Sequence, residues 1–369
     1  MLLVAVALLE AVSFVALYVA EGIRPGTVLD LFMDRHFAAI TRESARKFGD
    51  GLYHPELGWD YEPLSHYEGI NSAGDLYTMS WDAGGARDDG LFNYQPVMAT
   101  YGDSFAAGEE VNNDETWQYF LSIITDKRVL NYGTSGYGTD QALMKFKLHL
   151  RKHNIFPFTV ITIYDDNIKR LLNMFRPFYR PGDGLTLGFK PRLLCSSSLF
   201  VESNPLVPYV EDASELRQLA ESLVAADPYA RAKVTLNFPY SLRLAQVFTE
   251  LVRAKLGAGS WLTPGSLNLW ADQDAVHLMQ CIVGEFIELC RQYRSIPVIL
   301  LIPRAGDENQ PPYDQFVRQL KTRHPDVVVV DMAAQEFDVD RFRVLPKGGH
   351  TSAYGNLVIA NALKEALGL

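Results

Sequence analysis

From residue 96 onward, short apolar runs alternate with longer segments in which apolar residues recur with a helical period. The runs are rich in β-branched residues, which is typical of strands buried on both faces of a parallel sheet. The alternation predicts an α/β fold with a right-handed, doubly wound sheet and functional groups at the carboxyl ends of the strands. The runs are PVMATY at 96–101, RVLNY at 128–132, FTVITIY at 158–164, PVILLIP at 297–303 and DVVVVD at 326–331.

Two parts of the chain do not follow this alternation. Residues 23–95 mix a helical pattern with aromatic residues, glycine and proline, which indicates an irregular lead-in packed on the main domain. Residues from about 170 to 270 separate the third apolar run from the fourth, and we interpret them as an insertion that covers the strand ends. A second small domain is the alternative for this interval. The main domain is then expected to span residues 96–369, and Trp59 and Trp81 are expected to anchor the core.

The chain begins with an apolar run, MLLVAVALLEAVSFVALYVA, which is interrupted only by Glu10. A run of about 20 residues is long enough to cross a bilayer core as a helix, and this one lacks the basic start and the cleavage site of a signal peptide. We therefore expect residues 1–22 to be an uncleaved, single-pass transmembrane anchor; a buried or cleaved segment is the alternative. Glu10 would be costly in lipid, so it is expected to snorkel, to be protonated or to meet a polar group on a membrane-protein partner.

The overall charge excludes one class of partner. The 369 residues carry a formal net charge of −10, whereas nucleic-acid-binding proteins present a basic face to the phosphates, so no nucleic-acid partner is expected. The three cysteines, Cys195, Cys281 and Cys290, form neither a disulfide framework nor a metal-ligand spacing. The sequence also contains no phosphate-binding loop, zinc motif or dinucleotide-binding motif, and we expect no metal and no cofactor.

The first apolar run is followed by a short turn, and the stretch ATYGDSFAAGEEV at 99–111 places Ser104 in it. A serine hydroxyl at this position lies at the active edge of the sheet, where backbone N–H groups can face a developing oxyanion. Serine and aspartate are also ordinary residues of turns and helix caps. The turn alone therefore leaves both interpretations open.

Three motifs taken together resemble the SGNH/GDSL hydrolase superfamily. They are GDS at 102–104, NYGTSGYGTDQ at 131–141 and KGGHTSAYGNLVIANAL at 347–363. The resemblance covers residues 97–369 with a large insertion, and LGW at 57–59 adds a likeness to membrane-linked bacterial members. It implies a flavodoxin-like sheet of five parallel strands and a site for acyl transfer.

The resemblance implies roles for three residues. The serine of the GDS motif is the nucleophile in this superfamily, and it corresponds to Ser104. The backbone N–H groups of Ser104 and of Gly136 correspond to donors of the oxyanion hole. His350, shortly before the last helix, corresponds to the general base that accepts the serine proton and returns it to the leaving alkoxide. The other histidines are expected to be surface or packed residues; they are His36, His54, His66, His149, His153, His277 and His324.

The third motif of the superfamily, Gly-x-Asn-Asp, is replaced here by YDDN at 164–167. The spacing puts Asp166 where the oxyanion-donating asparagine belongs. A carboxylate there would repel a developing negative charge unless it is protonated or turned away. A one-residue adjustment of the backbone would let Asn167 serve instead, and loss of one oxyanion donor typically costs about 2.7–4 kcal/mol of transition-state stabilisation.

The acid that orients the histidine is missing from its usual place. The superfamily has Asp-x-x-His, whereas Lys347 stands three residues before His350. An ammonium group offers only donors and cannot accept the imidazole N–H. A backbone carbonyl could substitute for the acid, or Asp338 or Asp340 could fold back toward the imidazole.

These features predict a membrane-anchored SGNH-type esterase or O-acyltransferase that forms an acyl-enzyme on Ser104. Its substrate would be an acylated envelope glycan, a lipid or a similar ester, and this class is implied by the resemblance alone. The alternative is a catalytically eroded accessory or structural subunit of a membrane protein complex, because two mechanistic positions are altered. Basic residues after the anchor favour a cytoplasmic body, whereas the resembling bacterial proteins usually face outward. We expect the body to be extracytoplasmic, in the periplasm.

Overall fold

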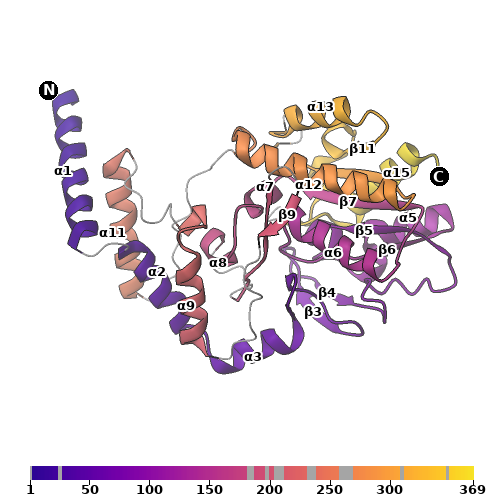
Figure 1. Ribbon diagram of the computed structural model, residues 1–369, viewed down its shortest axis with the longest axis horizontal. Helices are drawn as coiled ribbons and strands as arrows, with labels where there is room; N and C mark the ends of the chain where they lie inside the picture. Colours follow the sequence, from indigo (N-terminus) through magenta and orange to yellow (C-terminus); the bar gives the residue numbers. More distant parts are fainter. Residues whose placement is uncertain are drawn as a thin grey trace. The chain divides into compact units, whose positions relative to one another are not determined.

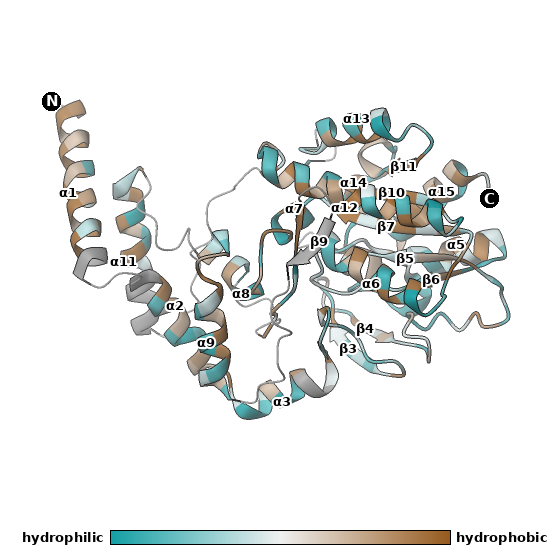
Figure 2. Ribbon diagram, in the orientation of Figure 1, coloured by the Kyte–Doolittle hydropathy of each residue, from teal (hydrophilic) through white to brown (hydrophobic). Residues whose placement is uncertain are grey.

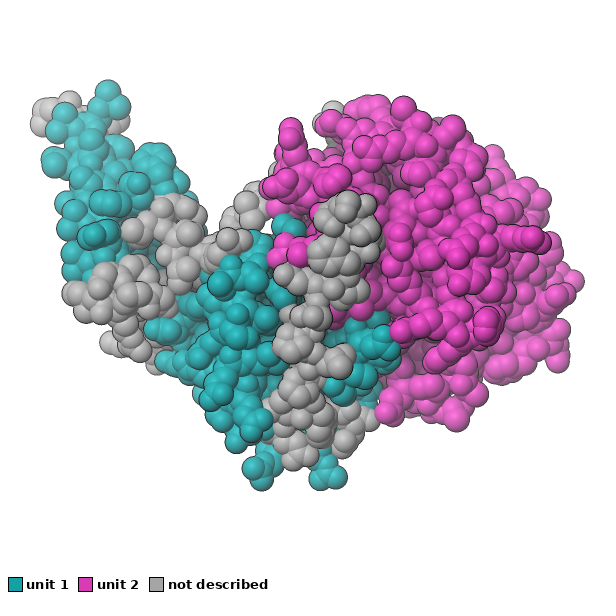
Figure 3. Space-filling view, in the orientation of Figure 1, with its two compact units in different colours: residues 1–59, 172–190, 204–267 teal, residues 60–171, 191–203, 268–369 magenta. Residues whose placement is uncertain are grey.

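The computed structural model describes residues 2–23, 27–180, 187–195, 199–202, 212–230, 238–256, 269–307, 311–345 and 349–369. The chain forms two compact units, which Figure 3 distinguishes by colour. Unit 1 comprises Met1–Trp59, Leu172–Lys190 and Asn204–Leu267, and unit 2 comprises Asp60–Leu171, Pro191–Ser203 and Asn268–Leu369. The lead-in expected at 23–95 and the insertion expected at 170–270 are thus each divided between the two units.

Unit 2 is built on a sheet of five parallel strands (Figure 1). The strands are β5 (Pro96–Tyr101), β6 (Arg128–Asn131), β7 (Phe158–Tyr164), β10 (Ile296–Ile302) and β11 (Val328–Asp331). Their order in the sheet is β6-β5-β7-β10-β11, which is 2-1-3-4-5 when the strands are numbered along the chain. This is the flavodoxin-like order, so the expected doubly wound α/β class is confirmed. The order reverses between β5 and β7, and ligands of such sheets bind beyond the carboxyl ends of the strands at that point.

Helices cover both faces of this sheet (Figure 1). Val160 of β7 and Val298 of β10 belong to a buried cluster that includes side chains of α5 and α15. On α6 and α12, the rings of Phe146 and Phe286 lie 5.4 Å apart. Successive residues of a strand point to opposite faces, so strands covered on both sides read as continuous apolar runs. The larger helices of unit 2 are α5 (Trp117–Thr125), α6 (Thr139–Arg151), α12 (Gln273–Gln292), α13 (Asp314–Arg323) and α15 (Ala353–Leu367).

An antiparallel hairpin precedes the sheet in unit 2. Its strands, β3 (His66–Ile70) and β4 (Leu76–Ser80), are joined by a turn over residues 71–75. Trp81 follows β4, is buried and stacks on Tyr61 with the ring centroids 4.0 Å apart, as expected for a core residue. The short helices of unit 2 are α4 (Ser104–Ala107), η1 (Asn113–Glu115), α7 (Asn167–Arg170), η2 (Met332–Ala334) and α14 (Val339–Phe342).

A disulfide joins Cys195 to Cys281 in unit 2. Cys195 ends β8 (Arg192–Cys195), which pairs with β9 (Leu199–Glu202), and Cys281 lies on α12. The sequence predicted no disulfide framework, and it did not point to this single bridge. The two residues are 86 positions apart and meet only because β8 lies against α12, which their spacing in the sequence does not indicate. The third cysteine, Cys290, is buried and free.

Unit 1 is mainly helical in its described residues. Its core is rich in phenylalanine, and the rings of Phe175 and Phe189 stack with their centroids 4.3 Å apart. Trp59 is also buried, as expected. The elements are α1 (Leu2–Ile23), α2 (Thr27–Ala38), α3 (Arg42–Gly51), β1 (Tyr53–His54), β2 (Gly58–Trp59), α8 (Arg176–Tyr179), α9 (Ala213–Leu223) and α11 (Tyr240–Leu256).

The expected N-terminal helix is present as α1, which is largely apolar and packs against α11 (Figure 2). Within the part of the chain that the structure describes, no helix is both long enough and apolar enough to span a membrane. The carboxylate of Glu10 accepts hydrogen bonds from the backbone N–H groups of Tyr240 and Ser241, at 2.6 and 3.3 Å, at the start of α11. A helix N-terminus favours a negative charge. Glu10 therefore has a partner within the chain, and the membrane-protein partner expected for it is not supported.

Candidate active site

The first strand of the sheet, β5, delivers Ser104 to the carboxyl edge. Asp103 caps the helix that follows, because its Oδ1 accepts the N–H of Phe105 at 2.9 Å. Ser104 is the first residue of α4, where backbone N–H groups have no acceptor within the helix. Gly133, after β6, lets a second loop approach closely, since a Cβ at this position would lie 2.2 Å from the backbone nitrogen of Ala107.

His350 comes from the far end of the chain, just before α15. The backbone N–H of Val344 donates to the His350 carbonyl at 2.9 Å and fixes the segment on the preceding loop. The imidazole Nε2 lies 2.8 Å from the Ser104 Oγ, although the two residues are 246 positions apart. The structure therefore brings together the serine and the histidine that the motifs pointed to, at hydrogen-bond distance.

The imidazole is oriented by Glu110, a residue that was not among the expected candidates. Glu110 Oε2 lies 2.9 Å from the His350 Nδ1 and accepts the His350 backbone N–H at 2.7 Å. A carboxylate at Nδ1 sets the tautomer in which Nε2 is the acceptor for the serine proton. Ser104, His350 and Glu110 thus form a complete Ser-His-acid arrangement.

The second oxygen of Glu110 is held by the β3–β4 hairpin. Glu110 Oε1 accepts the backbone N–H of Ser72 at 2.6 Å and also the Ser72 hydroxyl. Gly349 packs so closely that a Cβ there would lie 2.1 Å from Glu110 Oε2. Glu110 itself has a φ of +71°, a left-handed conformation that is uncommon for a residue other than glycine. Such conformations persist where the surroundings over-determine them, and they cluster at functional sites.

Arg87 fixes the loop that carries Glu110. Its guanidinium is buried and donates to the carbonyl oxygens of Ala107 (2.6 Å), Gly108 (2.5 Å) and Val111 (2.5 Å). Its Nε donates to Asn113 Oδ1 at 2.8 Å, and a fifth contact goes to the Thr78 carbonyl at 3.2 Å. The five N–H donors of one guanidinium therefore all have acceptors, and most of them are in the loop at 107–113.

The charges around His350 favour its protonated form. Burial lowers its pKa, but the carboxylates of Glu109 and Glu110 oppose this, and the net result is a raised pKa of His350. Burial also acts to raise the pKa of Glu110, yet hydrogen bonds from His350 and Ser72 lower it to about 2. Glu110 is therefore ionised at any pH at which His350 titrates. Glu109 Oε2 lies 3.7 Å from Nε2 and accepts a hydrogen bond from the Ser135 hydroxyl at 2.8 Å.

Asn167 is engaged elsewhere and does not donate into the site. Its Nδ2 donates to Asp103 Oδ2 at 2.9 Å and to the Tyr137 carbonyl at 3.3 Å, while its Oδ1 accepts the N–H of Tyr164 at 2.8 Å. Arg170 donates to the same two acceptors, Asp103 Oδ2 and the Tyr137 carbonyl. The amide N–H groups of Asn167 are thus used by the buried Asp103 and by the Tyr137 carbonyl. The expectation that Asn167 replaces the oxyanion-donating asparagine does not agree with this geometry.

Asp166 is ionised and neutralised by neighbouring cations. Its Oδ1 lies 2.7 Å from Arg304 Nη2 and 2.8 Å from Lys169 Nζ. Burial acts to raise its pKa, but the charges of Arg170 and Lys169 lower it overall. An ionised Asp166 cannot donate a hydrogen bond to an oxyanion. The repulsion expected between its carboxylate and an oxyanion is offset, because Arg304 and Lys169 pair with its charge.

The remaining expected oxyanion donor, Gly136, lies in the turn between β6 and α6. Its φ of +81° is a conformation that suits glycine. Among the described residues, no acceptor is found for the N–H groups of Gly136 and Ser104. Both groups therefore remain candidate donors of an oxyanion hole.

None of the groups that the sequence suggested in place of the orienting acid is the acceptor at His350 Nδ1. Asp338 caps α14 by accepting the N–H of Asp340 at 3.1 Å, and the acceptor at His350 Nδ1 is Glu110 instead. Lys347 lies outside the described residues. The signal that could have pointed to Glu110 is the pair of acidic residues, GEE at 108–110, six positions after the serine. Nothing in the sequence pattern pointed to Ser72 or Arg87.

The resemblance to the SGNH/GDSL superfamily thus includes the strand order and the Ser104–His350 pair. No family model matches the chain, and no curated protein matches it. Solved structures that resemble it include a G-D-S-L family lipolytic protein from Desulfitobacterium hafniense, with a TM-score of 0.37, 10% identity, and coverage of 74% of this chain and 99% of that one. A G-D-S-L family member from Veillonella parvula matches with a TM-score of 0.35, 13% identity, and coverage of 73% and 96%.

A third similar structure is a carbohydrate esterase family 2 enzyme with a carbohydrate-binding domain from Corynascus thermopiles (Myceliophthora fergusii). It has a TM-score of 0.32 and 13% identity, and the match covers 74% of this chain and 67% of that one.

The contact between Glu110 and His350 predicts a measurable change in titration. In a Glu110→Gln variant we expect the pKa of His350 to fall by about 1–3 pH units, because a neutral amide replaces the carboxylate that stabilises the imidazolium. The measurement is an NMR titration of the His350 ring. Asp338→Asn is the control and should leave the titration unchanged; an unchanged His350 pKa in Glu110→Gln would contradict the assignment.

A side chain at position 349 should disturb the contact between Glu110 and His350. A Gly349→Ala variant must displace Glu110 or the segment before His350, so the His350 pKa should fall as it does in Glu110→Gln. Gly284→Ala is the matched control, because a Cβ at this position in α12 meets no atom within 4 Å. An NMR titration that finds the His350 pKa of Gly349→Ala equal to that of the unaltered protein would rule out this contact.

Proposed function

We propose that this protein is a serine esterase or O-acyltransferase that forms an acyl-enzyme on Ser104. The single observation that carries the proposal is the chain of hydrogen-bond distances from Ser104 Oγ through the His350 imidazole to Glu110. An unassisted serine hydroxyl is a poor nucleophile and needs a base held within reach. A neutral His350 supplies that base.

The reaction begins with attack of Ser104 Oγ on the carbonyl carbon of an ester. His350 Nε2 takes the serine proton as the new C–O bond forms, and Glu110 stabilises the resulting imidazolium through Nδ1. The imidazolium then gives its proton to the leaving alkoxide as the ester C–O bond breaks. In the second half of the reaction, water or an acceptor hydroxyl attacks the acyl-enzyme, and His350 again acts as the base. Attack by water gives hydrolysis, and attack by an acceptor hydroxyl gives acyl transfer.

Negative charge on the tetrahedral intermediate would be stabilised by backbone donors. The N–H groups of Ser104 and Gly136 are the candidates, because both lie in turns at the same strand ends and have no other acceptor among the described residues. Asn167 and Asp166 are not included in this proposal. The site would then work with one donor fewer than the superfamily pattern, which costs about 2.7–4 kcal/mol of transition-state stabilisation if nothing replaces it.

Glu110 removes the main objection to activity. Loss of the orienting acid lowers the rate of a serine protease by about 10⁴, so the lysine at position 347 suggested an eroded site. With Glu110 at Nδ1, no acid is needed three residues before His350. The alternative role as a non-catalytic subunit is correspondingly less well supported, and Glu10 no longer calls for a membrane-protein partner.

The substrate and the location are further parts of the proposal. We propose an acylated envelope glycan or lipid as the substrate, on the resemblance to membrane-linked SGNH proteins. We also propose that residues 1–20 attach the chain to a membrane with the body outside the cytoplasm. The apolar side chains that α1 leaves exposed support attachment; examples are Leu3, Val4, Leu8 and Val12.

The nucleophile can be tested with a fluorophosphonate probe, which modifies activated serines. The purified protein should be labelled at one site, and Ser104→Ala should abolish labelling because Ser104 is the serine whose Oγ faces the imidazole base. Ser135→Ala is a control with an intact Ser104. Equal labelling of Ser104→Ala, or no labelling of the unaltered protein, would refute the proposal.

The pH dependence follows from the charge of Glu109. Activity requires neutral His350, so the rate should rise with pH through the raised pKa of His350. Glu109→Gln removes a charge that favours the imidazolium, and the rising limb of the profile should move to lower pH. The measurement is kcat/KM for p-nitrophenyl acetate against pH, with the exposed Glu68→Gln as control. A limb that stays in place or moves upward in Glu109→Gln would contradict the assigned influence of Glu109.

A further inference from the structure

Outside the candidate active site, three metal-ligating side chains of unit 2 meet at one place. They are Cys195 at the end of β8, and His277 and Cys281 on α12. His277 and Cys281 are four residues apart, so they lie on the same face of the helix. The ligand atoms of the three residues all lie within 4.8 Å of one another. The cluster therefore brings together metal-ligating side chains from the strand β8 and the helix α12.

Two of the three distances in the cluster match edges of a metal tetrahedron. The His277 Nε2 lies 3.6 Å from the Cys195 Sγ and 3.7 Å from the Cys281 Sγ. Zinc takes sulfur at about 2.3 Å and histidine nitrogen at about 2.0–2.1 Å, and the tetrahedral angle between them gives an S···N separation of about 3.5–3.6 Å. The imidazole therefore has the separation of a zinc ligand from each sulfur. After reduction, the two sulfurs must move apart to about 3.8 Å to complete the tetrahedron.

The backbone positions of Cys195 and Cys281 fit both a disulfide and a pair of thiolates bound to one metal ion. The Cα atoms of Cys195 and Cys281 are 6.2 Å apart, within the range of about 4.4–6.8 Å that disulfides have. Reduction by an external dithiol converts this disulfide to two thiols, and the dithiol is oxidised to its own disulfide. Binding of a divalent ion then releases the two thiol protons, since thiolates are the ligands. Both states would crosslink β8 to α12.

We propose that Cys195, His277 and Cys281 bind one zinc ion when the disulfide is reduced. Two thiolates and an imidazole form a set that suits zinc, whereas calcium and magnesium prefer oxygen ligands. Three protein ligands leave the fourth position to water. The site is independent of the proposed acyl chemistry.

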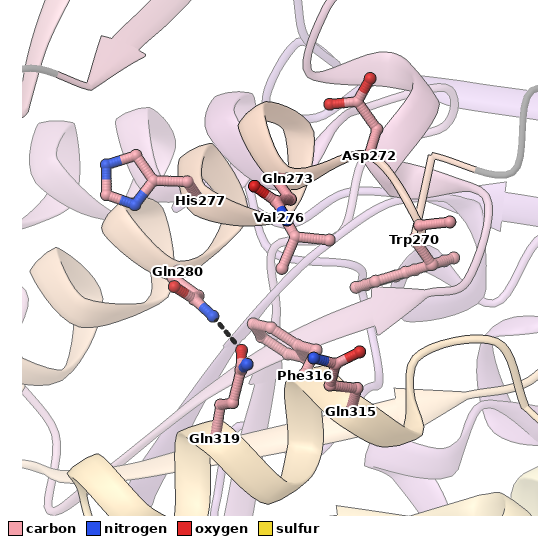
Figure 4. A pocket seen from close by; sticks show the side chains of 10 residues that line it. Trp270, Asp272, Gln273, Val276, His277, Gln280, Gln315, Phe316 and Gln319 are labelled. Atoms are coloured by element: carbon pink, nitrogen blue, oxygen red, sulfur yellow. Dashed lines mark hydrogen bonds between the residues drawn. The ribbon is translucent and has the colours of Figure 1, made fainter.

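The surroundings allow an ion to enter. His277 is exposed, and it lines a pocket of about 290 Å³ between α12 and α13. Figure 4 shows the His277 ring at the opposite end of this pocket from Trp270. The two cysteines are half-buried. Access from solvent is a requirement for a metal site that forms after folding.

The test uses the full chain, reduced with dithiothreitol and then freed of excess reductant, with Co²⁺ as the spectroscopic probe. We expect one Co²⁺ per chain, with thiolate-to-cobalt charge-transfer absorption that one equivalent of Zn²⁺ removes. The oxidised chain should show no such absorption. Circular dichroism establishes that the reduced chain is folded. The folded, reduced chain should then show two reactive thiols, Cys195 and Cys281, because Cys290 is buried, and three after denaturation.

Variants separate a built site from casual binding by thiols. His277→Ala retains both cysteines but removes a metal ligand. Loss of a residue that only hydrogen-bonds to a ligand weakens metal binding roughly 10- to 100-fold, so this variant should weaken Co²⁺ binding by more than that. Cys281→Ser leaves Cys195 as the one thiolate ligand and should at least halve the charge-transfer absorption, and the exposed His66→Ala is the control. Absence of binding to the reduced chain, unchanged affinity in His277→Ala, or loss of folding on reduction that Zn²⁺ does not restore would each overturn the proposal.

Discussion

The candidate active site depends on one buried cation. The Arg87 guanidinium lies among carbonyl oxygens of the loop after α4, and each of its N–H donors has an acceptor. Burial lowers its pKa to about 10, so it remains charged under ordinary conditions. Hydrogen bonds to a charged group contribute about 1.5–3 kcal/mol each, and an unpaired buried charge would cost more than this. The loop at 107–113 is therefore held to this arrangement, and the left-handed backbone of Glu110 can be maintained.

A second buried network fixes the turn that carries the nucleophile. Asp103 caps α4 with one oxygen and accepts from Asn167 and Arg170 with the other. Removing one partner of a buried ion pair typically costs about 3–5 kcal/mol, whereas losing a helix cap costs about 1 kcal/mol. The pairing with Arg170 is thus the larger reason for the position of Asp103. It also explains why Asn167 is not available to an oxyanion, because turning its amide toward the site would leave Asp103 with one donor fewer.

The sequence predicted those parts of the molecule that depend on local patterns. Strands such as β7 and β10 are buried on both faces, so their apolar runs are continuous, and the flavodoxin-like order followed from the resemblance. Ser104 and His350 lie in motifs that can be read without a structure. Glu110 was not recognised in this way, since its partner is 240 positions away and the usual place of the acid is taken by Lys347. Cys195 and Cys281 were missed for the same reason, because only the packing of β8 on α12 brings them together.

The position of the acid changes how the site is assembled. Glu110 lies on the loop after α4, the helix that begins with Ser104, so the nucleophile, the acid and Arg87 belong to one continuous stretch of unit 2. His350 is carried in from the other end of the chain, and Glu110 accepts both its backbone N–H and its Nδ1–H on one oxygen. The contact that docks the segment at 349–351 is therefore the contact that orients the imidazole. An acid three residues before the histidine would move together with the histidine. Glu110, in contrast, orients the imidazole only when the C-terminal segment is docked. The ability of His350 to act as a base therefore depends on the packing of α15.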